Sequence, residues 1–202
     1  MRSRVFLQVL VIALLASGCA QYSEVREGVN SIGRMEVVAK SGWKSVRASD
    51  IPHQRRSSRT WTVDGLDSER LMLIPRIGEG DALFRDDAVE LPEFRPDMTN
   101  EEIAELVESS LTLILASSDQ SLSVSNVREQ AYGLFGGFMF DINGSLSASQ
   151  EYGGFAGGFV YEDELYLSIF LAAKPDAYER HKDAAMELVK STTLSQKTIR
   201  MY

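Results

Sequence analysis

The chain has 202 residues, with 21 basic and 29 acidic side chains, a formal net charge of −8 and a hydrophobic fraction of 44%. This length suits a single folded domain. An acidic chain is a poor candidate for binding nucleic acid or for general adhesion to anionic lipid, so we expect no nucleic-acid partner. The one cysteine, Cys19, has no partner for an intrachain disulfide.

The first 18 residues follow the order of an export signal. Arg2 and Arg4 precede an apolar run from Val5 to Leu15, and small residues at 16–18 lead to Cys19. The apolar run is too short for an ordinary transmembrane helix, which needs about 20 residues. An uncleaved N-terminal anchor and an ordinary secretory signal are the alternative interpretations.

The segment Leu-Ala-Ser-Gly-Cys at 15–19 resembles the bacterial lipobox, with Ala16 at a position where the family usually has leucine. The resemblance implies lipidation of Cys19 through its thiol, cleavage of the Gly18–Cys19 bond, and acylation of the new amino group by a chain such as palmitate. It further implies that Ala20, in place of aspartate, directs the lipoprotein to the periplasmic face of the outer membrane in a two-membrane cell. The expected contact with the membrane is through this lipid.

After the signal (residues 1–18), residues 19–33 are predicted to form a lipidated N-terminus and a short polar tether, and residues 34–202 a single α+β domain. Strands are predicted at 35–39, 43–48, 59–64 and 69–77, where β-rich segments are separated by turn residues. His53 to Arg59 includes three arginines. We interpret it as a solvated loop; binding of a phosphate, an acidic partner or a headgroup is the alternative.

Two helices and four further strands are predicted in the rest of the chain. Thr99 and Glu102 match a capping box that begins a helix, and Pro175 opens a last helix that ends near Ser191. Strands are predicted at 121–129, 134–143, 152–161 and 165–172, with a tight turn at Asn143–Gly144 and a hairpin loop at 162–164. Such short connections require antiparallel pairing. The predicted fold is a mostly antiparallel sheet packed against two amphipathic helices.

The order of these elements resembles the PsbP/Mog-like fold, an α-β-α sandwich found in photosystem, Ran-binding and bacterial envelope proteins. The resemblance is carried by the strand pair of residues 158–170, by Tyr178-Glu-Arg-His181 on the last helix and by Ser191 at its end. It covers about residues 35–195. It implies a protein that acts by binding other proteins, and it transfers no catalytic residue.

Neither the glycine-rich segments nor the histidines form a known catalytic motif. The segments 133–138 and 153–159 lack the spacing of phosphate-binding loops, so we interpret their glycines as sites of close backbone approach and their phenylalanines as core. His181 is expected at the margin of the core, bonded to a neighbour, and His53 lies beside arginines. With these two histidines far apart in sequence, we expect no metal and no cofactor.

The leading hypothesis is therefore a non-catalytic envelope lipoprotein that binds another envelope component, expected to be a protein, in assembly or maintenance. One alternative is a hydrolase that uses the carboxylates of Asp86 and Asp87, which requires them to converge in a cleft. The neighbouring pair Glu101 and Glu102 is already explained by helix capping. A second alternative is binding of a small apolar ligand between sheet and helix, in a cavity lined by phenylalanines.

Overall fold

The computed structural model describes residues 22–115, 121–147 and 150–195. The strands are β1 (Tyr22–Glu24), β2 (Gly28–Ile32), β3 (Met35–Ala39), β4 (Lys44–Val46), β5 (Arg59–Thr62), β6 (Glu69–Ile77), β7 (Ser121–Tyr132), β8 (Phe135–Ser147), β9 (Gln150–Tyr161), β10 (Glu164–Ala172) and β11 (Thr193–Leu194). The helices are the short 3-10 helix η1 (Ala48–Asp50), α2 (Asn100–Leu115) and α3 (Pro175–Lys190).

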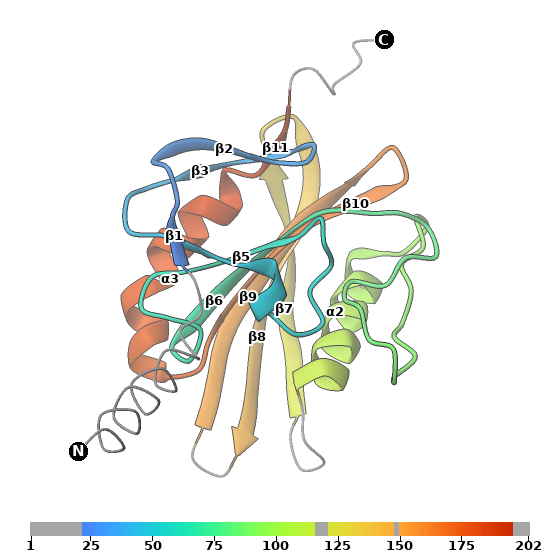
Figure 1. The fold of residues 1–202 in the computed structure, drawn as a ribbon. Helices are drawn as coiled ribbons and strands as arrows, with labels where there is room; N and C mark the ends of the chain where they lie inside the picture. Colours follow the sequence, from blue (N-terminus) through green and yellow to red (C-terminus); the bar gives the residue numbers. More distant parts are fainter. Residues whose placement is uncertain (1–21, 116–120, 148–149, 196–202) are drawn as a thin grey trace, which may run out of the picture.

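The strands form two sheets, and all their pairings are antiparallel. The large sheet has the order β1-β4-β5-β6-β10-β9-β8-β7, and a small sheet has the order β11-β3-β2. Helices α2 and α3 lie on opposite sides of the large sheet (Figure 1). This confirms the predicted α+β sandwich. No helix in the described part of the chain is long and apolar enough to span a membrane.

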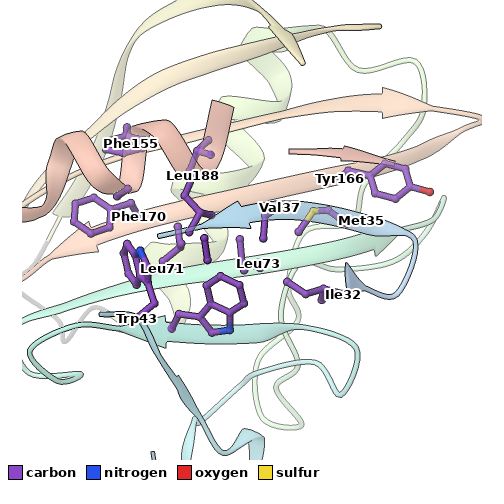
Figure 2. Packing of buried hydrophobic residues seen from close by; sticks show 14 of the residues in the cluster. Ile32, Met35, Val37, Trp43, Leu71, Leu73, Phe155, Tyr166, Phe170 and Leu188 are labelled. Atoms are coloured by element: carbon purple, nitrogen blue, oxygen red, sulfur yellow. The ribbon is translucent and has the colours of Figure 1, made fainter. Parts of the chain in front are cut away.

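The large sheet has a separate apolar core on each face. Along β6, Leu71 and Leu73 belong to the core beneath α3, whereas Met72 and Ile74 belong to the core beneath α2. This alternation follows from the two-residue period of a strand. Figure 2 shows the first core, where Leu188 of α3 lies over strand side chains of both sheets.

The predicted start of α2 and both predicted ends of α3 are confirmed. The backbone N–H of Thr99 donates to Glu102 Oε2 (2.7 Å), and the N–H of Glu102 donates to Thr99 Oγ1 (3.2 Å), which is the reciprocal pattern of a capping box. Helix α3 has Pro175 in its first turn and is capped by Ser191, whose N–H donates to the carbonyl oxygen of Glu187 (3.0 Å).

The predicted tether is wrong for residues 22–32, which include β1 and β2. Strand β1 pairs with β4, and β2 pairs with β3. Val25 and Ile32 are buried in the α3-side core, and the Val25 N–H donates to the carbonyl oxygen of Trp43 (2.9 Å). Strands of three and five residues with few apolar side chains are too short to show a period, so this segment was indistinguishable from a polar linker.

Asn143 and Gly144 do not form the predicted turn. They lie inside β8, opposite Gly153 and Tyr152 of β9, and the pairing continues to Ser147. The long β8–β9 ladder therefore overrides the local turn signal. The predicted hairpin loop after β9 is confirmed as a turn at Glu162–Asp163, whose φ angles of +49° and +60° are those that a tight hairpin requires.

Glycines allow the central strands to approach closely, as the sequence predicted. A Cβ added to Gly137 would collide with the carbonyl oxygen of Gly158 and would lie 2.8 Å from Phe159 Cβ. A Cβ added to the neighbouring Gly136 meets no atom within 4 Å. Phe159 itself is fully buried, so the strand cannot shift away without opening the core.

We predict that Gly137→Ala lowers the free energy of unfolding by about 1–3 kcal/mol, because overpacking forces backbone shifts. Urea denaturation measures this change. Gly136→Ala is the matched control and should change the free energy of unfolding by less than about 0.5 kcal/mol. Equal effects of the two substitutions would show that the close approach of the strands at Gly137 does not determine the loss of stability.

Candidate functional site

A cavity of about 190 Å³ lies between the large sheet and the C-terminal end of α2. Met72 and Ile74 of β6 and Ile114 of α2 contribute apolar side chains to it. The loop that precedes β5 closes one side. The remaining lining residues are Ile51, Pro52, His53, Gln54, Arg55, Ser58, Thr60, Arg70, Phe84 and Leu115.

The loop that carries His53 is fixed in place by polar contacts with the segment after β6. His53 has a φ of +61°, and its carbonyl oxygen accepts the N–H of Arg85 (2.8 Å). Its Nδ1 lies 2.8 Å from Asp86 Oδ2. Arg55 donates to Asp81 Oδ2 (3.0 Å) and to the carbonyl oxygen of Ala82 (2.5 Å). Part of the arginine-rich segment, residues 53–59, therefore lines the cavity, so the segment is not only a solvated loop.

Arg70 differs from the other basic residues at the cavity. His53 and Arg55 each have a carboxylate partner, whereas Arg70 has none in the described ranges. Its guanidinium donates from Nη2 to the carbonyl oxygen of Leu66 (3.2 Å). A half-buried guanidinium has five donors, so most of those on Arg70 are available to an anion.

Ser58 adds a second polar group that can still form hydrogen bonds. Its side chain is 4% exposed, and Oγ has no hydrogen-bond partner among the described residues. A buried hydroxyl without a partner costs about 1–3 kcal/mol relative to a satisfied one. The cavity therefore combines an apolar floor with a cation and a hydroxyl that a bound molecule can engage.

Asp86 and Asp87, the proposed hydrolytic pair, have different surroundings. Asp86 Oδ1 accepts the N–H groups of Ala88 (2.7 Å) and Val89 (3.1 Å), and Oδ2 pairs with His53. These hydrogen bonds, with that of Ala88 the strongest influence, lower the pKa of Asp86, so it is ionised at neutral pH and is unsuited to act as a general acid. Asp87 is exposed. Both aspartates line one open hollow of about 630 Å³, and the hydrolase alternative stays a prediction.

His181 lies at the margin of the core, as predicted, and its neighbour is Asp64. The two are joined between His181 Nε2 and Asp64 Oδ2 at 2.9 Å, and Arg180 Nη1 lies 2.9 Å from the same oxygen. The hydrogen bond from His181, assisted by the charge of Arg180, lowers the pKa of Asp64. The ligand atoms of Asp64, His181 and the buried Glu69 lie within 4.8 Å of one another, so these residues can hold a metal ion.

Several functional residues were missed from the sequence. The sequence places Arg70 in a strand, but the cavity that it lines depends on where α2 packs. The meeting of Asp64, Glu69 and His181 depends on how α3 crosses the sheet, and no local signal indicates it. The expected phenylalanine lining is wrong apart from Phe84, because the large rings fill the two cores. Gly18 and Cys19 lie outside the described residues, so lipidation stays a prediction.

The sequence matches no known family and no curated protein. The structure resembles the solution structure of cyanobacterial PsbP from Synechocystis, with a TM-score of 0.56 and 13% identity over 89% of this chain and 96% of that one. The Ran-binding protein Mog1p of Saccharomyces cerevisiae gives 0.47 and 11% identity over 87% and 96%. LpqN of Mycobacterium tuberculosis, described as involved in cell envelope biogenesis, gives 0.45 and 12% over 92% and 96%. The likeness to PsbP confirms the predicted α-β-α sandwich fold.

Proposed function

We propose that this chain is a lipid-anchored protein of the bacterial envelope whose folded domain is a non-catalytic binding module. Its ligand is a small amphiphile with an apolar tail and an anionic head. The observation that carries the ligand class is the cavity whose apolar floor lies beside Arg70, a guanidinium without a carboxylate partner in the described part of the chain.

The position of β1 supports the anchoring part of the proposal. Strand β1 starts at Tyr22, three residues after Cys19 in the sequence, and three residues span at most about 10 Å. Beside Tyr22 lies a hollow lined in part by the exposed residues Arg47, Arg56 and Arg59. Although the whole chain is acidic, this hollow near the proposed anchor is lined by three arginines, which suits contact with anionic headgroups.

We predict that Cys19→Ala abolishes incorporation of labelled fatty acid and leaves the signal uncleaved, because the thiol is the acceptor that lipidation needs. Metabolic labelling followed by mass spectrometry of the N-terminal peptide measures both effects. Ser17→Ala is the control and should keep the label. Normal labelling of the Cys19 variant would contradict the proposed anchor and would leave the cavity proposal standing.

The volume of the cavity limits what its ligand places inside. An engineered cavity of about 150 Å³ accepts benzene, whereas sites for whole drug-sized ligands have about 300–1,000 Å³. At about 190 Å³, the cavity suits one ring or the end of a short acyl chain. The head then lies beside Arg70, which can donate hydrogen bonds to it.

We predict that the full chain binds octanoate more tightly than octanol, since only octanoate can pair with Arg70. Arg70→Gln should weaken octanoate binding about tenfold and leave octanol binding unchanged. Isothermal titration calorimetry measures both affinities.

Two further variants on α2 separate cavity binding from surface adsorption. Ile114→Phe fills the cavity and should remove binding of both probes. Leu113→Phe adds the same ring one residue away, at a side chain that is 45% exposed, and should bind as the unaltered chain does. Equal binding by the two α2 variants would show that the probes do not use the cavity.

A protein partner is a second candidate, favoured by an apolar pair on the small sheet. Val29 of the edge strand β2 lies directly opposite Val38 of β3, and the two are 63% and 48% exposed. Cross-strand pairs of this kind present one joined apolar surface on a sheet face. An exposed edge strand also offers unpaired backbone groups to an added strand.

We predict that a photo-crosslinking amino acid at Val29 or at Val38 captures one and the same envelope protein in living cells. The same amino acid at Val89, a valine that is 38% exposed on the loop before α2, is the control and should not capture it. Gel shifts and mass spectrometry identify the adducts. If adducts with that protein were equally frequent at Val89, the proposed binding of a partner at the small sheet would be contradicted.

A further inference from the structure

Glu69 is an unusual residue at the start of β6, because it is a carboxylate that is only 1% exposed. Its Oε1 accepts hydrogen bonds from Thr62 Oγ1 (2.7 Å) and from the N–H groups of Val63 (2.6 Å) and Asp64 (2.9 Å). Its other oxygen, Oε2, is buried and has no hydrogen-bond partner among the described residues. Burying a carboxylate oxygen is costly unless a donor or a metal ion compensates it.

The group around Glu69 has the chemistry of metal ligands. His181 and Asp64 each bring a ligand atom that lies within 4.8 Å of the others and of one from Glu69. Three protein ligands with an exposed side open to water are the arrangement of many zinc sites. The exposed side here is at Asp64, which is at the surface, whereas Glu69 closes the inner side.

We propose that Asp64, Glu69 and His181 form a binding site for a divalent transition-metal ion, with Zn²⁺ as the ion that suits one imidazole and two carboxylates. Tetrahedral zinc, with ligand distances of about 2.0–2.1 Å, needs ligand atoms about 3.3 Å apart. Because Oε1 of Glu69 is fixed by three donors, the adjustment falls on Asp64 and His181. Imidazole ligation disfavours Mg²⁺ and Ca²⁺, which prefer oxygen.

Arg180 is the group that competes with the ion. Its Nη1 lies 2.9 Å from Asp64 Oδ2, which is also the oxygen bonded to His181. Arg180 has a second partner in Asp176, with Nη2 to Oδ2 at 3.2 Å, so it can leave Asp64 and still keep an ion pair. Lys44 donates to the carbonyl oxygen of Val63 and adds a further positive charge nearby. Removing the charge of Arg180 therefore favours the metal.

The test is calorimetric titration of Zn²⁺ into the full chain, purified in detergent without a histidine tag and stripped with EDTA. We expect one site per chain. Glu69→Gln keeps the acceptor for Thr62 and removes the free carboxylate oxygen, so zinc affinity should fall at least about tenfold. Asp64→Asn is the second variant should Glu69→Gln fail to fold. Arg180→Gln should raise zinc affinity, which a purely structural ion pair does not predict. Mg²⁺ should not compete.

The chain has two histidines, so NMR can identify which of them binds zinc. Imidazole NMR signals of His181 should shift on addition of Zn²⁺, while those of His53, which pairs with Asp86 elsewhere, should stay unchanged. His53→Ala is the matched control and should bind zinc with unchanged affinity. Shifts of His53 alone, an unchanged affinity in Glu69→Gln, or no binding at millimolar Zn²⁺ would each overturn the proposal.

Discussion

The structure depends on one constraint, which is that the central strands of the large sheet are buried on both faces. Leu71 and Met72 are adjacent in β6 and belong to different cores. Such a sheet is not stable until each face is covered. Helix α2 covers one face, and α3 together with the small sheet covers the other (Figure 1). The short N-terminal strands are therefore part of the folded core and not a linker to it.

Burial on both faces moves polar groups to the margins of the covering layers. The candidate cavity lies where α2 ends, and the candidate metal site lies where α3 passes the turn between β5 and β6. At both places a buried polar atom is left without a partner in the described chain, on Ser58 and on Glu69 respectively. Unsatisfied buried groups are rare and costly in folded proteins, so each needs a partner such as water or a ligand. Ser110 Oγ on α2 is a third such atom in the described chain, and it lies at neither candidate site.

The sequence predicted those parts of the fold that depend on local patterns. The capping box at Thr99, the proline start of α3 and the antiparallel pairing of the closely connected strands after α2 are read from neighbouring residues, and all three are confirmed. The turn predicted at Asn143–Gly144 is absent, because long-range pairing with β9 outweighs the preference of this dipeptide for turns. The candidate sites could not be predicted for a related reason, since each joins residues far apart in sequence, such as Asp64 and His181.

A strand that is apolar on both faces poses a problem of register, because a slip by one residue exchanges one apolar face for another at little cost. The polar pair at the start of β6 resolves it. Consecutive residues point to opposite faces, so Glu69 lies beneath α3 and Arg70 lies at the cavity beside α2. A slip by one residue would place the guanidinium of Arg70 under α3 and would withdraw Glu69 from the hydroxyl of Thr62. Glu69 and Arg70 thus contribute to the two candidate sites and also to the register of β6.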